Sequence, residues 1–179
     1  MRKVILYIAA SLDGKIAKED GDTGWLHDLP NPEQTDYGYG EFYSSVDTTL
    51  MGNSTYKMIQ SFDMPFPYAD KVNYVFTRNN ELADNEDVSY VHDNPVEFVK
   101  ELKSQPGDDI WLIGGGQMNT LLMEHNLIDE LILFIMPIIL GEGIPLFPGK
   151  LDQKLMQLSS SKTHASGALE LVYHRKEEE

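Results

Sequence analysis

Three consecutive glycines, Gly114-Gly115-Gly116, join an apolar run at residues 110–113 to a stretch with helical spacing at residues 117–124. A buried strand and a helix are therefore expected to meet at the glycines. Glycine costs backbone entropy at such a junction and is favoured where another group must approach the backbone closely. Two interpretations stay open. Either the N–H groups at the helix start bind an anionic group such as a pyrophosphate, or the glycines form a tight turn needed only for helix–sheet packing.

The hydrophobic pattern of the whole chain alternates strands with helices. Strands are expected at residues 3–10, 47–52, 71–79, 87–92, 109–113 and 129–140. Helices are expected at residues 33–46, at 53–62 with Asn53 or Ser54 as the N-cap, at 95–104 and at 117–124. Two further strands, 154–164 and 168–175, would form an antiparallel pair. Because this alternation implies parallel crossovers, we expect a mixed sheet. The G-x-G-x-x-G fingerprint fits poorly, since Asn119 stands at its last glycine, and this argues against an ordinary Rossmann domain.

Charge and composition exclude several classes of protein. The chain has 179 residues, a formal net charge of −15 and no cysteine, and its five histidines never stand at a metal-ligand spacing. A nucleic-acid partner would need a basic surface, and the apolar run at residues 4–10 is too short for a membrane span or a signal peptide. We expect one domain over residues 1–179, located in the cytoplasm, with a solvated tail at 176–179 and without a metal, a nucleic acid or a membrane as partner.

Two other strand ends carry residues suited to a phosphorylated ligand. The segment Gly52-Asn53-Ser54-Thr55 combines a glycine and short hydroxyls with a helix start, although plain helix capping is the more common use of these residues. The segment Thr77-Arg78-Asn79 places an arginine beside hydroxyl and amide donors, which suits a ribose 2′-phosphate. A surface charge is the other interpretation of Arg78. In a parallel sheet these segments and the three glycines would lie at the same edge.

Four segments occur in an order and spacing that resemble the dihydrofolate reductase superfamily: YIAASLDGKIA, TTLMGNSTYKMI, KVNYVFTRN and WLIGGGQMNTLL. With LIDELILFIMPIILGEGIPLF, they make nearly the whole chain similar to stand-alone relatives of the C-terminal reductase domain of the riboflavin-pathway deaminase/reductase. The resemblance implies an α/β, dihydrofolate reductase-like three-layer fold. Its sheet would be mixed and mostly parallel, of about eight strands, with a C-terminal antiparallel hairpin and helices on both faces. The resemblance also implies NADPH as the cofactor.

The cofactor contacts that the resemblance implies fall on the strand ends described above. The nicotinamide contacts fall on Ala9, Ile16 and Ile113, and the 2′-phosphate position falls on Thr77 and Arg78. Pyrophosphate and ribose contacts fall on two segments, which comprise Gly52, Asn53, Ser54 and Thr55, and Gly114, Gly115, Gly116, Gln117 and Met118. Trp25 resembles a tryptophan that lies by the cofactor in riboflavin reductases, with packing of the long loop as the alternative. A cis peptide bond between Gly114 and Gly115 is also implied.

One expected phosphate contact of the cofactor and two residues expected on the substrate side depart from the families' patterns. Dihydrofolate reductases often have an arginine where Asn53 stands, and riboflavin reductases have a glutamate at Gly114 and tend to have an arginine near Tyr43. Folate enzymes use a buried carboxylate on their first helix. Asp36, sixteen positions before Gly52, is the candidate catalytic acid by that resemblance, with a role at the start of the helix as the alternative.

The sequence therefore predicts an NADPH-dependent reductase that transfers a hydride to a flat heterocyclic, pteridine- or pyrimidine-like substrate. Residues 11–32 would form a lid, and Tyr37, Tyr39 and Phe42 would stack on the substrate or pack in the core. The alternatives are a 5-amino-6-(5-phosphoribosylamino)uracil reductase of riboflavin biosynthesis, dihydrofolate reductase itself, a non-catalytic nucleotide-binding module and a structural subunit. An edge strand as apolar as residues 129–140 would need covering, so a homodimer is expected.

Overall fold

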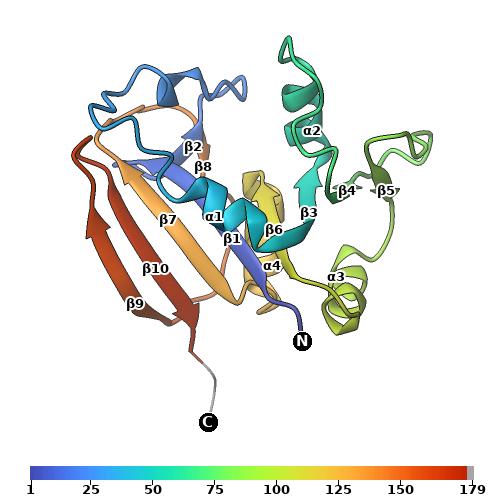
Figure 1. Ribbon diagram of the computed structural model, residues 1–179. Coiled ribbons are helices and arrows are strands. Elements are labelled where there is room, and N and C mark those ends of the chain that lie inside the picture. Colours follow the sequence, from blue (N-terminus) through green and yellow to red (C-terminus); the bar gives the residue numbers. More distant parts are fainter. Residues whose placement is uncertain (177–179) are drawn as a thin grey trace.

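The computed structural model describes residues 1–176, and residues 177–179, part of the expected tail, lie outside the described residues. Eight strands form one sheet in the order β5-β4-β3-β6-β1-β7-β10-β9 (Figure 1). They are β1 (Val4–Ser11), β3 (Val46–Gly52), β4 (Val72–Phe76), β5 (Ser89–Val91), β6 (Asp109–Gly114), β7 (Glu130–Met136), β9 (Met156–Thr163) and β10 (Leu169–Arg175). A separate pair consists of β2 (Lys15–Ala17) and β8 (Ile144–Pro145).

The sheet is mixed and mostly parallel, as the sequence predicts. The six strands from β5 to β7 in the sheet order all pair in parallel, and β10 and β9 then add an antiparallel hairpin beside β7. Four of the connections between parallel strands pass through α1 (Tyr39–Ser44), α2 (Asn53–Gln60), α3 (Pro95–Ser104) and α4 (Gly116–Glu124), and β4 is joined to β5 by a loop at residues 77–88. Parallel strands require such crossovers, because a tight hairpin reverses the chain direction.

Helices cover both faces of the sheet. Side chains alternate along β6, so that Ile110 and Leu112 pack with residues of α3 and α4, whereas Trp111 and Ile113 face α1 and α2. The same face continues over β7, where Phe134 packs under the long loop that contains Trp25. Such alternation follows from the period of two residues in a strand. The result is a three-layer arrangement with α1, α2 and the long loop on one side.

The structure corrects several expectations about single elements. The helix expected at residues 33–46 begins only at Tyr39, because Tyr37 and Gly38 have positive φ values. The N-cap of α2 is Gly52, without a side-chain cap, and not Asn53 or Ser54. The pair β2–β8 and a short 3-10 helix at Gly24–Leu26 were not expected from the pattern of the sequence.

The strand expected at residues 129–140 ends at Met136, and Pro137, which lacks a backbone donor, follows it. It lies between β1 and β10 and is not an edge strand, so the apolar edge from which a homodimer was expected does not exist there. The edges are instead β5 and β9. Over residues 1–176, no helix is both long and apolar enough to cross a membrane.

Candidate functional site

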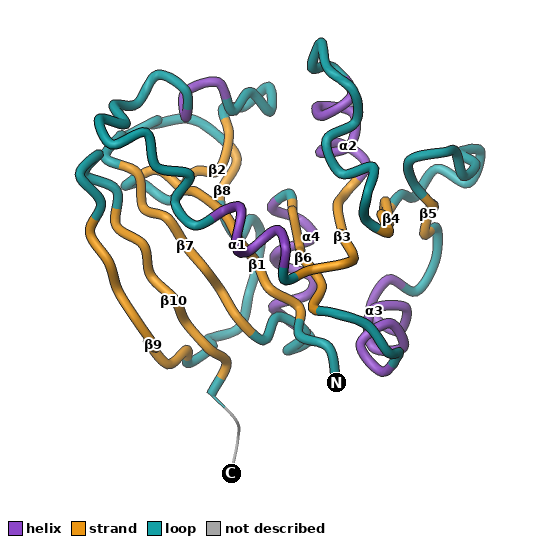
Figure 2. The backbone as a smooth tube through the Cα atoms, in the orientation of Figure 1, coloured by secondary structure: helices purple, strands orange, loops and turns teal. Residues whose placement is uncertain are grey.

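Three of the predicted binding segments meet at one edge of the sheet. Gly52, the last residue of β3, stands opposite Phe76, the last residue of β4, and Met51 stands opposite Gly114 of β6. In Figure 2 the chain leaves β3 and β6 at the end of the sheet where α2 and α4 begin. The carboxyl ends of parallel strands are where open α/β sheets bind their ligands. The segments that follow Gly52, Phe76 and Gly114 therefore form the candidate site.

The sheet opens between β1 and β6 at this edge. The paired residues run only from Val4–Ile110 to Leu6–Leu112, although β1 continues to Ser11 in register with β7. Ala9 and Ile113, both expected to contact the nicotinamide, lie beyond the last pair. A flat ring placed at the separated strand ends would lie near the backbone of both strands. The opening is the feature of the fold that best suits an inserted ligand.

The three glycines have different surroundings. Gly114 has a φ of +115°, which favours glycine, and it is joined to Gly115 by the expected cis peptide bond. A Cβ atom on Gly115 would stand 3.2 Å from Oγ1 of Thr55, so the starts of α2 and α4 touch here. A Cβ atom on Gly116 would stand 2.7 Å from the carbonyl oxygen of Pro145. Gly116 therefore has a packing role, whereas Gly115 keeps two predicted binding segments in contact.

Four buried side-chain atoms within residues 1–176 lack a hydrogen-bond partner: Nε1 of Trp25, Oδ1 of Asn53, Nδ1 of His92 and Oδ1 of Asn119. Buried polar atoms are nearly always paired, so each exception requires a reason. Asn53 begins α2 directly after β3, and His92 directly follows β5, whose Val91 accepts a hydrogen bond from Thr77 N at 3.1 Å. All four atoms belong to residues at the carboxyl edge, where a polar ligand would supply the missing partners.

Two of these residues were missed by the sequence analysis. Asn119 occupies the last glycine position of the failed fingerprint, and its Oδ1 lies 3.2 Å from where a Cβ on Gly114 would stand. The asparagine at this position was a usable signal of a binding residue, because a polar side chain in a helix interior that faces a glycine loop requires a partner. His92 carries a weaker signal, since its only distinguishing feature in the sequence is its position after a short strand.

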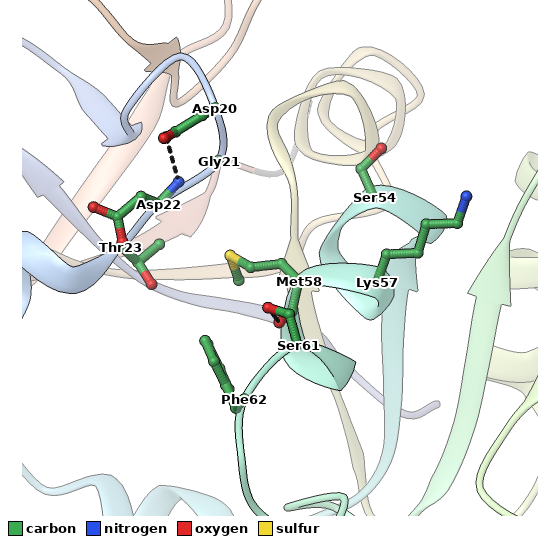
Figure 3. A pocket seen from close by; sticks show the side chains of 9 residues that line it. All are labelled: Asp20, Gly21, Asp22, Thr23, Ser54, Lys57, Met58, Ser61 and Phe62. Carbon is green, nitrogen blue, oxygen red and sulfur yellow. Dashed lines mark hydrogen bonds between the residues drawn. The ribbon is translucent and has the colours of Figure 1, made fainter.

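A cleft of about 460 Å³ separates the long loop from α2 (Figure 3). One wall contains Asp20, Asp22 and Thr23 of the loop. The other contains Met58 of α2 with Ser61 and Phe62, which follow the helix, and these three side chains point toward the loop. Ser54, one of the predicted contacts, also lines it. The cleft is within the usual size range of small-molecule sites. It lies beside the predicted binding segment that begins at Gly52.

The remaining predicted contacts lie around this edge. Ile16 is in β2, and Trp25 is buried at 2% exposure within an apolar cluster that includes Ala9 and Phe134. Thr77 is half-buried and accepts a hydrogen bond from Asn79 N, and Arg78 is exposed. In α4, Gln117 is exposed and Met118 is buried. Within the described residues, no three histidine, aspartate or glutamate side chains come together as a metal site would require.

Asp36 is positioned as a residue at the start of a helix. Its carboxylate is exposed and accepts hydrogen bonds from the backbone N–H groups of Gly38 and Gly40, both at 2.9 Å. The bonds from Gly40 and then Gly38 hold the pKa of Asp36 below its ordinary value. These contacts match the alternative role named from the sequence. A carboxyl group with a lowered pKa is also a weak proton donor near neutral pH.

The aromatic residues of α1 divide between core and surface. Phe42 is buried and stacks on Tyr7, with their ring centroids 4.3 Å apart, so core packing is its role. Tyr39 is half-buried and lies edge-on to Trp111 at 5.8 Å. Tyr43 donates a hydrogen bond to the carboxylate of Asp70 and lies under Nζ of Lys71. Tyr39 is therefore the α1 aromatic residue best placed to meet a planar ligand.

The fold is that of the dihydrofolate reductase-like class of α/β proteins. The model of the RibD C-terminal domain matches residues 2–169, and the chain belongs to this family. It is 39% identical to the uncharacterized protein YwjB of Bacillus subtilis (strain 168) over 97% of this chain and 98% of that protein.

Solved structures agree with this assignment. A protein from Shewanella sp. PV-4, named provisionally for riboflavin biosynthesis, has a TM-score of 0.87 at 31% identity, covering 98% of this chain and 99% of that one. Dihydrofolate reductase from Enterococcus faecalis, complexed with NADP(H), has a TM-score of 0.69 at 15% identity, covering 98% and 97% of the two chains. The similarity to the dihydrofolate reductase shows only that the two proteins share a fold. Together they confirm the fold predicted from the sequence.

Proposed function

We propose that the protein is an NADPH-dependent reductase that transfers a hydride to a flat heterocyclic acceptor. The observation that carries this proposal is the opening between β1 and β6 at the edge where Gly52 and Gly114 meet. Family membership supports a reductase of the riboflavin-pathway type. The bound NADP(H) named for the Enterococcus faecalis neighbour supports a nicotinamide cofactor.

The residues at this edge fit such a cofactor. The unpaired buried atoms of Trp25 and Asn53 offer one donor and one acceptor to a ligand with amide and hydroxyl groups. The N–H groups at the starts of α2 and α4 would bind the pyrophosphate, since helix starts favour anions. Thr77 and Arg78 would bind the 2′-phosphate. When bound, the cofactor would supply the hydride, and the protein would orient both partners and exclude water.

The acceptor is proposed as pteridine- or pyrimidine-like, with the phosphoribosylamino uracil of riboflavin biosynthesis as a second candidate. Family membership favours that uracil. The contacts of Tyr43 favour another heterocycle, because its hydroxyl is bonded to the carboxylate of Asp70 and the neighbouring ammonium group of Lys71 is paired with that same carboxylate. A phosphate group would meet that carboxylate, and like charges in close contact destabilise each other.

Oxidation of NADPH followed by absorbance tests the proposal. Purified protein is mixed with NADPH and either dihydrofolate or 5-amino-6-(5-phosphoribosylamino)uracil, with boiled protein as the control. Turnover with either acceptor supports a reductase and identifies its class. Binding of NADPH without turnover of any heterocycle would instead support the alternative of a non-catalytic nucleotide-binding module.

A homodimer is proposed on a basis different from that given by the sequence. The edge strand β9 is exposed along nearly its whole length, and Leu158 in this strand is 49% exposed. Edge strands with exposed apolar side chains are usually covered. A second copy pairing along β9 would cover both the backbone edge and Leu158. Location in the cytoplasm stays a prediction.

A further inference from the structure

A second cavity, of about 240 Å³, lies at the end of the sheet opposite the three glycines. Its walls come from the segment before β1, the last turn of α3, the residue before β7 and the end of β10, and include Arg2, Lys3, Lys103, Asp129, His174 and Arg175. Because β7 runs parallel to β1 and antiparallel to β10, these positions share one end of the sheet (Figure 1). The cavity is therefore separate from the candidate cofactor site.

The lining of this cavity is basic, although the chain as a whole is acidic. Among the described residues, four of the 14 lysine and arginine side chains line it together with a single carboxylate, in a chain of formal net charge −15. These four bases are paired with three carboxylates, those of Asp47, Asp129 and Glu130, and Asp129 serves both Lys103 and Arg175. A concave surface lined mainly by one sign of charge concentrates its potential. The cavity therefore favours an anion.

Arg2 is held deep in the wall, with its side chain 6% exposed. A buried cation is stable only when it is paired and hydrogen-bonded. Nη2 of Arg2 donates to Asp47 and to Oγ1 of Thr48, and Nε donates to the carbonyl oxygen of Asp108. Nη1 has no protein partner within residues 1–176, so it is free to donate to a ligand in the cavity.

Lys103 and Arg175 share the carboxylate of Asp129 and still have unused donors. Nζ of Lys103, whose side chain is 7% exposed, donates to Asp129 and to the carbonyl oxygen of Leu127. Arg175 donates to Asp129 at 3.4 Å and to the carbonyl oxygen of Asn126 at 2.9 Å. An ammonium and a guanidinium group carry more N–H groups than these bonds use. The lining thus offers donors to a ligand, while the carboxylate of Asp129 is engaged by both cations.

Backbone hydrogen bonds fix the walls before a ligand arrives. The N–H group of Arg2 donates to the carbonyl oxygen of Lys103 at 3.0 Å, and that of Arg175 to the carbonyl oxygen of Asp129 at 3.1 Å. The segment before β1 is thereby fixed to the end of α3, and the end of β10 to the start of β7. A preformed array of donors loses little conformational freedom on binding, which favours affinity.

We propose that this cavity is a binding site for a phosphate-like oxyanion, which would accept hydrogen bonds from Arg2, Lys103 and Arg175. The planar guanidinium group matches the geometry of phosphate oxygens, and the lysine ammonium adds a compact positive charge. The volume lies below the usual range for small-molecule sites, so the cavity is too small for a dinucleotide. It admits free phosphate or the end group of a small organic phosphate. The inference does not depend on the proposed reductase function.

Titration with inorganic phosphate, followed by NMR of protein labelled at its histidine side chains, tests the proposal, because His174 lines the cavity. At constant pH and ionic strength, phosphate should shift the resonances of His174 to saturation, with a dissociation constant of about 1 mM or less. Arg175→Gln should raise this constant about tenfold, because it removes charged hydrogen bonds to the anion. The matched control is Arg78→Gln, which alters an exposed arginine at the opposite end of the sheet and should leave the constant unchanged.

Glycerol 3-phosphate, titrated in the same way, identifies the source of the anion. Tighter binding than that of inorganic phosphate would show that the cavity takes the end group of an organic phosphate, and equal or weaker binding would indicate the free ion. The inference would be overturned by shifts of His174 that do not saturate or that chloride reproduces. It would also be overturned if Arg175→Gln left the dissociation constant unchanged, or if only Arg78→Gln raised it.

Discussion

Oγ1 of Thr55, in the first turn of α2, lies 3.2 Å from the point where a Cβ atom on Gly115 would stand. The starts of α2 and α4 are therefore in contact through one hydroxyl and one glycine. Both helix starts present N–H groups to the same small region. A pyrophosphate bound there would touch both helices at once.

Substitution Gly115→Ala should weaken NADPH binding more than it weakens the fold. The added methyl group meets Oγ1 of Thr55 and must push the two helix starts apart by a few tenths of an ångström. We expect a roughly tenfold increase in the dissociation constant, which corresponds to about 1.4 kcal/mol. Fluorescence titration measures it. Unchanged affinity would show that the contact has no part in binding.

Substitution Gly116→Ala should weaken the fold more than it weakens NADPH binding. Its methyl group would stand 2.7 Å from both the carbonyl oxygen of Pro145 and Cδ of Pro148, so it overpacks the loop after β8. Overpacking of this kind costs about 1–3 kcal/mol. Urea denaturation should show a loss of that size, larger than the loss for Gly115→Ala. Equal stability of the two variants would contradict the separate roles given to these neighbouring glycines.

Substitution Arg78→Gln tests the 2′-phosphate position. Arg78 is exposed after β4, and a charged hydrogen bond to phosphate contributes about 1.5–3 kcal/mol. NADPH affinity should therefore fall by a factor of about 10 to 100, while NADH affinity stays the same. Arg175→Gln, which alters an exposed arginine of β10, is the matched control and should change neither affinity. Equal losses for NADPH and NADH would rule out recognition of the 2′-phosphate by Arg78.

The carboxylate of Asp13 links the turn after β1 to the loop after β7 through hydrogen bonds. It accepts hydrogen bonds from Ser11 Oγ and from the N–H groups of Leu140 and Gly141. Led by the Ser11 bond, these lower its pKa from 3.8 to about 2. Because this pKa is lower in the folded than in the unfolded state, the ionised carboxylate stabilises the folded protein at pH values above the unfolded-state pKa. The contribution is lost as the pH falls through about 2.

Substitution Asp13→Asn should therefore lower the urea midpoint at pH 7. The difference from wild type should shrink as the pH falls from about 4 toward 2, because the wild-type carboxylate becomes protonated there. Urea titrations over this pH series provide the measurement. A difference that stays constant down to the lowest pH would show that the charge of Asp13 is not what stabilises the loop.

Substitution Leu158→Lys should dissociate the proposed homodimer. A lysine on an edge strand opposes pairing with another strand, because its charge would be buried. Light scattering coupled to size exclusion should show a dimer for the wild type and a monomer for the variant. Val72→Lys replaces another exposed apolar residue, 53% exposed on β4, and should remain dimeric. A monomeric wild type would exclude the β9 interface.

The sequence predicted the fold where the local signal and the tertiary structure agree. Helix α3 was expected at its observed bounds, because Pro95 begins it and its apolar residues have helical spacing. The helix expected from residue 33 failed because Tyr37 and Gly38 adopt left-handed conformations that no hydrophobic pattern reveals. The interior position of β7 depends on which strands it pairs with, and that is decided by long-range contacts with β1 and β10.

The candidate site was predictable from its glycines and from two of the four residues with unpaired buried atoms, Trp25 and Asn53. Gly52 and Gly114 stand next to each other because β3 and β6 pair, as parallel strand order suggests. His92 could not be found in this way. Its significance comes from the burial of Nδ1, which lacks a hydrogen-bond partner.

Titration of the wild-type protein with NADPH and with NADH, followed by tryptophan fluorescence, shows whether this edge of the sheet binds a nicotinamide nucleotide. Trp25 is buried with its indole N–H unpaired, and Trp111 lies in β6 before Gly114, so both should respond to a ligand at this edge. We expect saturable quenching with NADPH and much weaker binding of NADH. Absence of binding by both nucleotides would contradict this expectation and leave the three glycines with a packing role alone.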